Sequence, residues 1–341
     1  MLYGHGDDLH AFEKAQITAN FSTNVWPEGP HPLLLSKLAA SIKQLDAYPE
    51  PAGKPFVEQL SAFYNVSAQH FLATNGTADA IYLIAQVFRK RTVTIFIPTF
   101  AEYEDAARLH QIECSFCNWN EIEKIPKLST DLAFICHPNN PTGQIVATEI
   151  LEAFIKKNPE TLFIIDEAYE GFLKHSQSLL SRIDSFKNVL LLRSLTKLFA
   201  LPGLRLGYIS GHPSIIQKIS EYKPPWSVNS LAVQAGVFIF QDYEMYLPDV
   251  IALLEETQWF LNEVKQIDGL EAMETLTNFF LVKSLFAEAK QLKVYLAGKG
   301  MLIRDAANFR GLSPNYFRLA TLQREKNQQL INELKLWNPN S

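Results

Sequence analysis

The chain of 341 residues has little of what marks several large classes of protein. Its three cysteines, Cys114, Cys117 and Cys136, cannot form a disulfide framework, and their odd number suits a reducing compartment. No apolar run approaches the roughly 18 residues that a membrane-spanning helix needs. The N-terminus, MLYGHGDDLH, carries acids where a signal peptide has basic and apolar segments. These absences predict a soluble cytoplasmic protein.

An excess of basic residues is missing as well. The chain has 31 Lys and Arg against 36 Asp and Glu, which gives a formal net charge of −5, and its pI is near 5.9. A chain without a basic face is not expected to bind nucleic acid or an acidic membrane surface. Internal repeats, low-complexity tracts and Gly/Ser linkers are also lacking.

Cys114 and Cys117 form a Cys-x-x-Cys pair, which could be half of a metal or redox site. The pair falls in IECSFC, a strand-like segment in which residues three apart point to opposite faces. No second pair of this kind exists to complete a zinc site. We therefore expect buried apolar cysteines and no metal.

Apolar residues make up 47% of the chain, enough to bury a sizeable core. Short, almost wholly apolar runs alternate with segments that have helical spacing, a pattern typical of βαβ units. The expected strands are 92–97, 132–136, 162–165, 189–192 and 206–209, and the expected helices are 78–89, 102–110, 148–157 and 214–222. The pattern predicts an α/β fold with a mostly parallel, doubly wound sheet.

The two ends of the chain have a different pattern. A Pro/Gly-rich stretch at 24–32 precedes one amphipathic helix, and the region after 245 reads as an α+β module with a long first helix. We predict a large domain over residues 46–244, and a smaller domain assembled from 1–45 and 245–341.

Three polar residues follow predicted strands and attract attention. Asp166, Lys197 and Asn140 each lie just past a buried strand, and ligands of open α/β sheets bind beyond the carboxyl ends of strands. Each has a plainer interpretation: Asp166 as a helix N-cap, Lys197 as a solvated lysine, and Asn140 as part of an ordinary turn. Taken singly, none of the three decides between structure and function.

Taken together, the motifs carry more weight. The order of Asn139-Asn-Pro-Thr-Gly143, Asp166-Glu-Ala-Tyr169, Ser194-Leu-Thr-Lys197 and Gly203-Leu-Arg-Leu-Gly207 resembles the aspartate-aminotransferase superfamily of pyridoxal-phosphate enzymes, fold type I. Upstream, Asn75-Gly-Thr-Ala-Asp79 resembles that family's phosphate-binding turn. The resemblance extends over essentially the whole chain.

The resemblance implies pyridoxal 5′-phosphate as cofactor and gives each motif a task. Lys197 would be the covalent anchor and proton-transfer base. Asp166 would pair with the ring nitrogen, and Asn140 and Tyr169 would donate to the ring hydroxyl. Phe100 would stack on the ring, unless it is an ordinary core aromatic. The phosphate would lie among Gly76, Thr77, Ala78, Ser194 and Arg205, joined by Tyr48 from a neighbouring subunit, which implies a homodimer.

Two subfamilies that act on phosphorylated amines compete for the closer resemblance. Several segments are similar to threonine-phosphate decarboxylases of cobalamin biosynthesis, including the stretch 302–312 and Tyr316-Phe-Arg318. On that resemblance Arg318 would hold a substrate carboxylate. His5, Gly6, Asn24, Asn140 and Arg304 would line the pocket of the substrate, a phosphorylated amino acid or amine.

Other features lean toward histidinol-phosphate aminotransferases or other class I/II aminotransferases that use 2-oxoglutarate and glutamate. Chain length and Asp166-Glu-Ala-Tyr169 resemble those enzymes, and decarboxylase relatives usually have two glycines after the histidine, where this chain has Gly6 and then Asp7. A third hypothesis is a pyridoxal-phosphate-sensing regulator. Such proteins have an N-terminal DNA-binding domain, whereas the motifs here begin within the first 30 residues.

Overall fold

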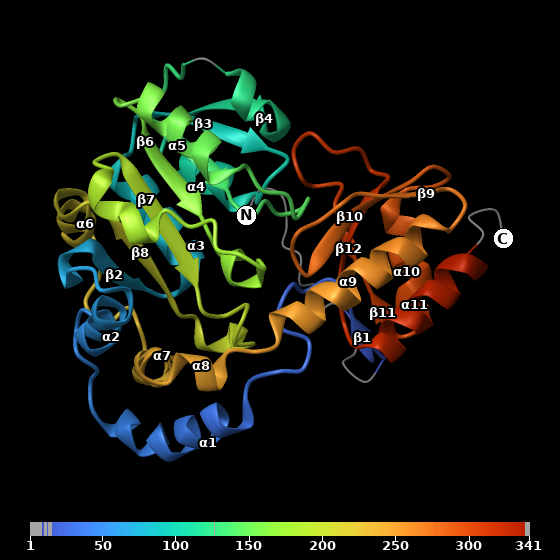
Figure 1. The fold of residues 1–341 in the computed structure, drawn as a ribbon, viewed down its shortest axis with the longest axis horizontal. Coiled ribbons are helices and arrows are strands. Elements are labelled where there is room, and N and C mark those ends of the chain that lie inside the picture. The colour runs from blue at the N-terminus through green and yellow to red at the C-terminus, as the bar shows by residue number, and fades with distance from the viewer. Residues whose placement is uncertain (1–8, 10–11, 13–15, 126, 338–341) are drawn as a thin grey trace.

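The computed structural model describes residues 9, 12, 16–125 and 127–337, which form two domains side by side (Figure 1). The larger domain contains a seven-stranded sheet, and the smaller contains a four-stranded sheet with its helices. Helix α9 (Val250–Lys265) runs from one to the other: Leu253 lies in the larger core, whereas Phe260 and Leu261 lie in the smaller one. In the described part of the chain, no helix is long and apolar enough to cross a membrane.

The large sheet has the strand order β2-β8-β7-β6-β5-β3-β4. Strands β3 to β7 run parallel to one another, and β8 is antiparallel to both of its neighbours, β7 and β2. The strands are β2 (Phe71–Thr74), β3 (Thr92–Ile97), β4 (Glu113–Asn118), β5 (Leu132–Cys136), β6 (Leu162–Asp166), β7 (Val189–Ser194) and β8 (Gly207–Gly211). The predicted fold class, an α/β fold with a mostly parallel sheet, is confirmed.

Helices cover both faces of this sheet because alternate residues of each strand are buried on opposite sides. In β6, Ile164 faces one core and Phe163 and Ile165 face the other. Residues of α3 (Gly76–Val87), α4 (Glu102–Leu109) and α6 (Pro213–Ser220) pack into the first core, and residues of α2 (Lys54–Tyr64), α5 (Thr148–Lys157) and α7 (Ser230–Gln241) pack into the second.

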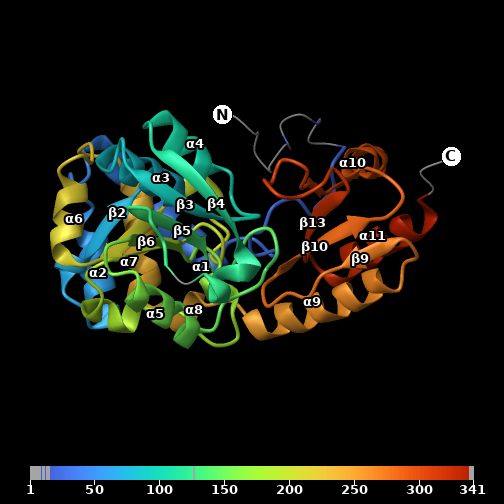
Figure 2. The same ribbon diagram turned by 90° about the horizontal axis from the view of Figure 1, so that it is seen from above.

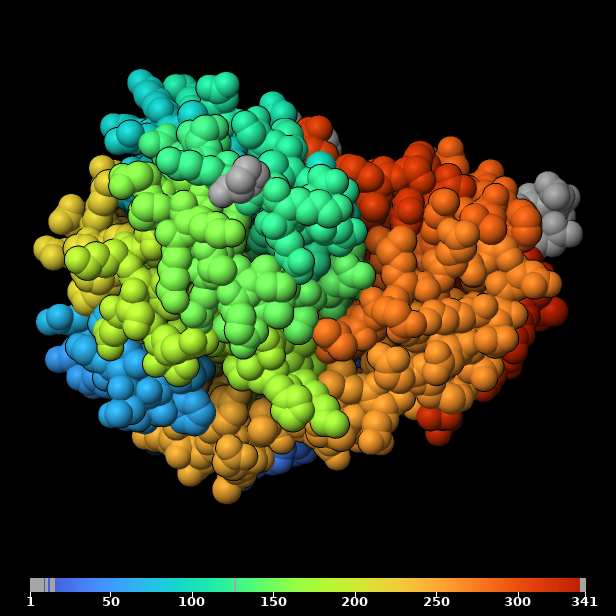
Figure 3. Space-filling view, turned by 45° about the horizontal axis from the view of Figure 1, so that its top comes forward, coloured from blue at the N-terminus to red at the C-terminus, as the bar shows by residue number. Residues whose placement is uncertain are grey.

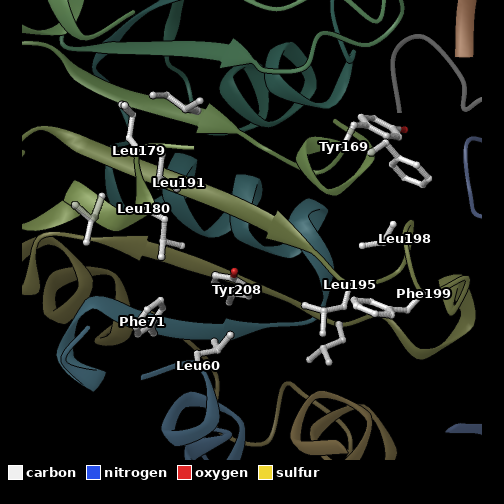
Figure 4. Close-up of a cluster of buried hydrophobic side chains, with 14 of the residues drawn as sticks. Leu60, Phe71, Tyr169, Leu179, Leu180, Leu191, Leu195, Leu198, Phe199 and Tyr208 are labelled. Atoms are coloured by element: carbon white, nitrogen blue, oxygen red, sulfur yellow. The ribbon is translucent and has the colours of Figure 1, made fainter. Parts of the chain in front are cut away.

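Figure 4 shows part of the second core, where Leu180 and Leu191 pack over the middle of the sheet. Tyr169, Leu195 and Leu198 lie past the carboxyl ends of the strands in the same view. The core therefore reaches the edge of the sheet, where it supports the segments that follow the strands.

The smaller domain pairs its strands in the order β12-β13-β10-β9, all antiparallel. Figure 2 shows β13, β10 and β9 of this sheet with helices α9, α10 and α11. Helices α9, α10 and α11 supply its core together with β10 and β13. Its further elements are β9 (Leu270–Ala272), β10 (Phe279–Ser284), α10 (Ala289–Gly298), β11 (Met301–Leu302), β12 (Arg304–Asp305), β13 (Tyr316–Ala320) and α11 (Arg324–Leu336).

The N-terminal segment contacts both domains. Strand β1 (Ala19–Asn20) pairs with β11 of the smaller domain. Helix α1 (Pro32–Ser41) packs instead against α7, and its Leu34 and Leu38 are buried in the larger core. This packing differs from the expected assignment of residues 1–45 to the smaller domain, because the apolar face of α1 finds its partner on the larger one.

Most predicted elements match the observed ones within about two residues. The structure adds α8 (Tyr243–Tyr246) and the 3-10 helices η2 (Ile42–Asp46), η3 (Ala68–His70), η4 (Trp119–Lys124), η5 (Glu170–Phe172), η6 (Leu180–Ser185) and η7 (Pro202–Leu204). Cys114 and Cys117 lie on β4 and pack against opposite cores, as expected for residues three apart on a strand.

The two domains are joined directly by an ion pair. Arg310 of the smaller domain donates two hydrogen bonds of 2.7 Å to the carboxylate of Glu104 on α4, and its guanidinium lies 4.3 Å from the ring centre of Phe116. The space-filling view shows the surfaces of the two domains in contact over a broad front (Figure 3).

Candidate active site

The carboxyl ends of β2, β3, β5, β6 and β7 meet at one edge of the large sheet, and the start of the antiparallel β8 lies at the same edge. A pocket opens there. It is lined by Thr77, Ala78, Phe100, Tyr103, Cys136, Asn140, Asp166, Ala168, Tyr169, Ser194, Thr196, Lys197 and Arg205. The topology thus brings together residues that are up to 128 positions apart in the sequence.

One end of the pocket is a cradle of donors around the start of α3. Gly76 has a φ of +83°, and a Cβ at this position would lie 2.5 Å from the guanidinium of Arg205, so only glycine fits. Gly207 is equally constrained, since its Cβ would lie 3.0 Å from the backbone of Gly76. The free N–H groups of the helix start, the Arg205 guanidinium and nearby hydroxyls make an anion site.

A short turn brings Lys197 back over the end of its strand. The Oγ of Ser194 lies 2.8 Å from the Oγ1 of Thr196 and accepts a hydrogen bond from the Thr196 N–H at 3.3 Å. The carbonyl of Lys197 accepts from the N–H of Trp26 at 2.9 Å. These bonds hold the backbone of the turn, and Lys197 lines the pocket between the anion site and Asp166.

Asp166 ends β6 with a carboxylate that is 3% exposed. Its Oδ1 accepts from the N–H of Ala168 at 3.0 Å, and its Oδ2 accepts from the hydroxyl of Tyr103 at 2.7 Å. Burial raises the pKa of Asp166, and these two hydrogen bonds and the charge of Lys197 oppose that rise. The helix N-cap interpretation is not supported, because the residues that follow form a turn and the 3-10 helix η5, not an α-helix.

A buried ion network supports the segment after Asp166. Arg193 of β7 pairs with both Glu167 and Glu170, at 2.9 Å from the Oε2 of Glu167. Burial raises the pKa of Glu167 to about 7, against the lowering effect of Arg193. The network ties the segment that follows β6 to the end of β7, which supports the positions of Asp166 and Tyr169.

Asn140 connects the pocket to the smaller domain. The turn that carries it closes through hydrogen bonds from the N–H of Gly143 to the carbonyl of Asn139 at 2.7 Å and from the N–H of Asn139 to the carbonyl of Gln144 at 2.8 Å. The Oδ1 of Asn140 accepts from Arg318 of β13, whose other terminal nitrogen donates to the carbonyl of Ser22 at 2.6 Å. Asn140 itself lines the pocket.

Arg304 and Arg318 stand opposite each other on neighbouring strands, as register partners of β12 and β13. Both are buried, with exposed fractions of 8% and 5%. Arg304 donates to the Oδ1 of Asn308 at 2.7 Å. Burial and, to a smaller extent, the charge of Arg304 lower the pKa of Arg318 to about 10, against the opposing effect of Tyr169. Two like charges in this arrangement repel each other, and an anion bound to Arg318 would reduce that repulsion.

The Nε of Arg318 is a buried polar atom with no hydrogen-bond partner among the described residues. Buried polar groups are nearly always paired, so this atom indicates a place for a polar ligand or water. A cofactor with a phosphate, an aldehyde, a ring hydroxyl and a ring nitrogen fits the anion site, Lys197, Asn140 and Asp166, respectively.

The structure brings most predicted site residues to this pocket and leaves a few elsewhere. Gly76, Asn24, Arg304 and Arg318 are not among the lining residues. Gly76 directly precedes Thr77, Arg318 bonds to Asn140, and Arg304 is the register partner of Arg318. Tyr48 is not among the lining residues; it is 85% exposed and contacts Trp226, with ring centres 5.3 Å apart. His5 and Gly6 lie outside the described residues.

Four lining residues were missed by the sequence analysis: Tyr103, Cys136, Ala168 and Thr196. Tyr103 follows Phe100 by three residues, a spacing that places both side chains on one side of a helical turn, and this signal could have found it. No group of three or more His, Cys, Asp or Glu in the described part of the chain could hold a metal ion.

Comparison with known proteins decides the family. The sequence model of the aminotransferase class I and II family matches residues 17–334. The chain belongs to this family. Its members are pyridoxal-phosphate enzymes, and pyridoxal phosphate is the cofactor of this chain as well.

Among relatives of known structure, L-threonine-O-3-phosphate decarboxylase from Porphyromonas gingivalis superposes with a TM-score of 0.90 and 33% identity, over 93% of this chain and 98% of that one. Threonine-phosphate decarboxylase of Salmonella typhimurium is 30% identical over 93% of this chain and 90% of its own length. Histidinol-phosphate aminotransferase of Methanocaldococcus jannaschii is 28% identical over 90% of this chain and 86% of its own length. Both expected subfamilies are thus among the relatives.

Proposed function

We propose that this enzyme is a pyridoxal-phosphate-dependent decarboxylase of a phosphorylated amino acid, with L-threonine phosphate as the substrate that fits best. The observation that carries the proposal is Arg318 of β13, a buried guanidinium whose hydrogen-bond acceptors, Asn140 and the Ser22 carbonyl, are uncharged. L-Threonine phosphate has a carboxylate that can pair with Arg318, and a phosphate that can bind near its register partner Arg304. Histidinol phosphate has a phosphate but no carboxylate, so it would give Arg318 no counter-charge.

The proposed roles follow from the contacts of each side chain. Hydrogen bonds to Asn140 and the Ser22 carbonyl fix the orientation of the Arg318 guanidinium, so it can bind a substrate carboxylate in a defined orientation. Arg304, oriented by Asn308 and with its guanidinium 5.2 Å from the ring centre of Phe309, would hold the substrate phosphate together with Asn24 and with His5 and Gly6 of the N-terminal segment. The contacts to the carboxylate and to the phosphate together determine which bond of the substrate Cα stands perpendicular to the cofactor ring.

On the cofactor side, Gly76, Thr77, Ala78, Ser194 and Arg205 would hold the phosphate, and Phe100 would cover the ring. Asn140 and Tyr169 would donate to the ring hydroxyl, and Asp166 would pair with the ring nitrogen. When bound, the cofactor supplies an electron sink for the bond that breaks. The bond from Cα to the carboxylate breaks, CO2 leaves, and a proton takes its place at Cα, with Lys197 positioned to move that proton.

Histidinol-phosphate transamination is the second candidate function. It is supported by the similarity to histidinol-phosphate aminotransferases and by the hydroxyl of Tyr169. Burial raises the pKa of this hydroxyl to about 12, so it stays protonated and can donate. The same lysine, aspartate and asparagine could serve this reaction, in which Lys197 would remove the Cα proton with the carboxylate of the amino donor left intact.

A second copy of the chain is the proposed macromolecular partner. Tyr48 and Trp226 form an exposed aromatic pair, and Leu33, Leu35 and Ile42 of the neighbouring α1 and η2 are also exposed. Exposed apolar residues of this kind are typical of a subunit interface. In such a homodimer Tyr48 would reach the phosphate site of the neighbouring subunit. The three free cysteines agree with a cytoplasmic location.

In the test, purified holoenzyme is incubated with L-threonine phosphate or with histidinol phosphate, each with and without 2-oxoglutarate. The formation of CO2 and of glutamate is measured separately. The proposal predicts CO2 and aminopropanol phosphate from L-threonine phosphate, with no requirement for 2-oxoglutarate. Glutamate formation from histidinol phosphate and 2-oxoglutarate, with no CO2 from L-threonine phosphate, would overturn the first function in favour of the second.

A further inference from the structure

Tyr103 is a fully buried tyrosine on α4 that lines the pocket. Its ring is held on two sides: it stacks on Phe134 with ring centres 4.8 Å apart and planes 6° apart, and it meets Phe100 edge-on at 5.8 Å. A buried aromatic ring packed in this way would serve the core equally well as phenylalanine. Packing in the core therefore explains the ring of Tyr103 but not its hydroxyl.

The hydroxyl donates to Asp166 and to no other carboxylate in the described part of the chain. The bond from the Tyr103 Oη to the Oδ2 of Asp166 is 2.7 Å, and both side chains are buried. Burial, followed by the charge of Asp166, raises the pKa of Tyr103 well above its usual value, so the phenol keeps its proton. In this pair Tyr103 is therefore the donor and Asp166 the acceptor.

Asp166 has few other groups to stabilise its charge. The titratable groups that face it from the packed elements are Tyr103 of α4, Cys136 of β5, Lys197 and Tyr169. Cys136 is its register partner on β5, and burial raises the pKa of that thiol to about 12, so it is neutral. The charge of Lys197 favours the ionised carboxylate. Two donors add directed hydrogen bonds to it, the Tyr103 hydroxyl on Oδ2 and the Ala168 N–H on Oδ1.

We infer that Tyr103 is a positioning residue: it holds Asp166 ionised and turned so that the carboxylate faces the ring nitrogen of the cofactor. The inference rests on the proposed role of Asp166. Without the hydroxyl, Oδ2 loses its donor, so part of the carboxyl takes up a proton and the rest is free to rotate about its side-chain bonds. Both changes weaken its pairing with a protonated ring nitrogen.

The test compares Tyr103→Phe with the wild type in binding pyridoxal phosphate and its 1-deaza analogue, in which a C–H group replaces the ring nitrogen. Both affinities are measured by titrating cofactor-free enzyme and following its tryptophan fluorescence, so the readout does not depend on turnover. Tyr103→Phe should weaken binding of pyridoxal phosphate about tenfold, the scale of one hydrogen bond to a charged group, and leave binding of the deaza analogue unchanged.

The matched control is Tyr82→Phe. Tyr82 also donates to a carboxylate at 2.7 Å, the Oε2 of Glu102, but it does not line the pocket. This variant should bind both cofactors as the wild type does. An equal loss of affinity for both cofactors in Tyr103→Phe, or no loss for either, would overturn the inference and leave Tyr103 as a core aromatic.

An Asp166→Asn background separates this inference from the proposed role of Asp166. Asp166→Asn alone should lose the preference for pyridoxal phosphate over the deaza analogue, and adding Tyr103→Phe should then change neither affinity. If Asp166→Asn keeps the wild-type preference, the role of Asp166 itself fails. If Asp166→Asn loses the preference but Tyr103→Phe keeps it, only the role of Tyr103 fails.

Should Tyr103→Phe not fold, 3-fluorotyrosine at position 103 replaces it in the test. This residue keeps the ring and makes a stronger donor, so the preference for pyridoxal phosphate should rise. An unchanged preference would contradict the inference.

Discussion

The proposed cofactor side and the proposed substrate side of the pocket are built in different ways. The cofactor side consists of residues that directly follow strands of one buried sheet, such as Asp166 after β6 and Lys197 after β7. The substrate side is assembled across the two domains: Arg318 of β13 reaches Asn140, which is 178 positions away in the sequence, and the Ser22 carbonyl near the N-terminus. One side is fixed by the sheet and the other by contacts between domains.

This difference has a physical consequence. Strand ends are held by ladder hydrogen bonds and by two apolar cores, so the cofactor groups keep their geometry in the absence of substrate. The arginines depend on a few polar contacts and on the Arg310–Glu104 ion pair near the domain boundary. Substitutions on the cofactor side should therefore affect the rate of the chemical step, and those on the substrate side should affect substrate binding and the choice of substrate.

The largest effect is expected for Lys197→Ala. Loss of the amine that moves the proton should lower kcat by roughly 10⁴-fold, while the anion site around Gly76 and Arg205 still binds the cofactor. Steady-state turnover and equilibrium dialysis of pyridoxal phosphate test the two halves of this statement. Lys174→Ala, at an exposed position in the same domain, is the control and should match the wild type; near-normal turnover of Lys197→Ala would refute the cofactor-side assignment.

Asp166→Asn should have the next largest effect, a loss in kcat of about 10²- to 10³-fold, comparable to the removal of another electrostatic contact in a buried site. The amide can accept a hydrogen bond but cannot stabilise a positive charge on the ring nitrogen. The fold should be retained, as measured by circular dichroism, because the amide keeps the shape of the side chain. Turnover close to that of the wild type would mean that Asp166 has only a structural task.

On the substrate side, Arg318→Ala and Arg304→Ala should each lower kcat/KM for L-threonine phosphate, mainly by raising KM. The expected loss corresponds to about 2–5 kcal/mol of binding free energy, because each variant leaves a buried anionic group of the substrate without its partner. Arg318→Lys should restore only part of the loss, since an ammonium cannot make the forked contacts of a guanidinium. The control is Arg324→Ala, whose side chain pairs with Glu256 away from the pocket. If the Arg318 and Arg304 variants lose kcat alone, the comparison between the two sides fails.

The smallest effect is expected at the domain boundary, for Glu104→Gln. Burial disfavours ionisation of Glu104, but hydrogen bonds and charges from Arg310 and Arg108 outweigh it and lower the pKa of its carboxyl. A lowered pKa in the folded state stabilises the protein above the ordinary pKa of Glu, and this contribution disappears as the pH falls through the folded-state pKa.

At pH 7 the Glu104→Gln variant should therefore lose about 1 kcal/mol of unfolding free energy, because Arg310 and Arg108 are partly exposed and solvent screens the pair. The gap between the two proteins should close as the pH falls below about 4. Urea unfolding at both pH values measures it. A gap that stays constant with pH would show that the ion pair does not stabilise the domain boundary.

The same comparison explains how far the sequence could predict the structure. The cofactor side was predictable because each of its motifs is a contiguous segment that follows an apolar run, as Asp166 and Lys197 do, and the parallel sheet brings these strand ends together. The strand ranges 92–97 and 132–136 agree with β3 and β5 for the same reason: buried parallel strands give a strong local signal.

The substrate side was harder because its contacts join segments that are far apart in the sequence. Nothing in the local pattern indicates that Arg304 and Arg318 are register partners, or that Arg318 reaches Asn140. The apolar face of α1 could be found from its spacing, but not the domain on which it packs. Tyr103 had a usable signal in its spacing from Phe100, yet its bond to Asp166 depends on how α4 packs on the sheet.

The central claim is that the edge of the large sheet holds pyridoxal phosphate with Lys197 as its covalent partner. The most direct test is to reduce the holoenzyme with borohydride, digest it and locate the modified lysine by mass spectrometry. The account predicts a single phosphopyridoxyl group on Lys197, with the visible absorption of the holoenzyme lost on reduction. Modification of Lys90 or Lys174 instead, with Lys197 unmodified, would contradict it.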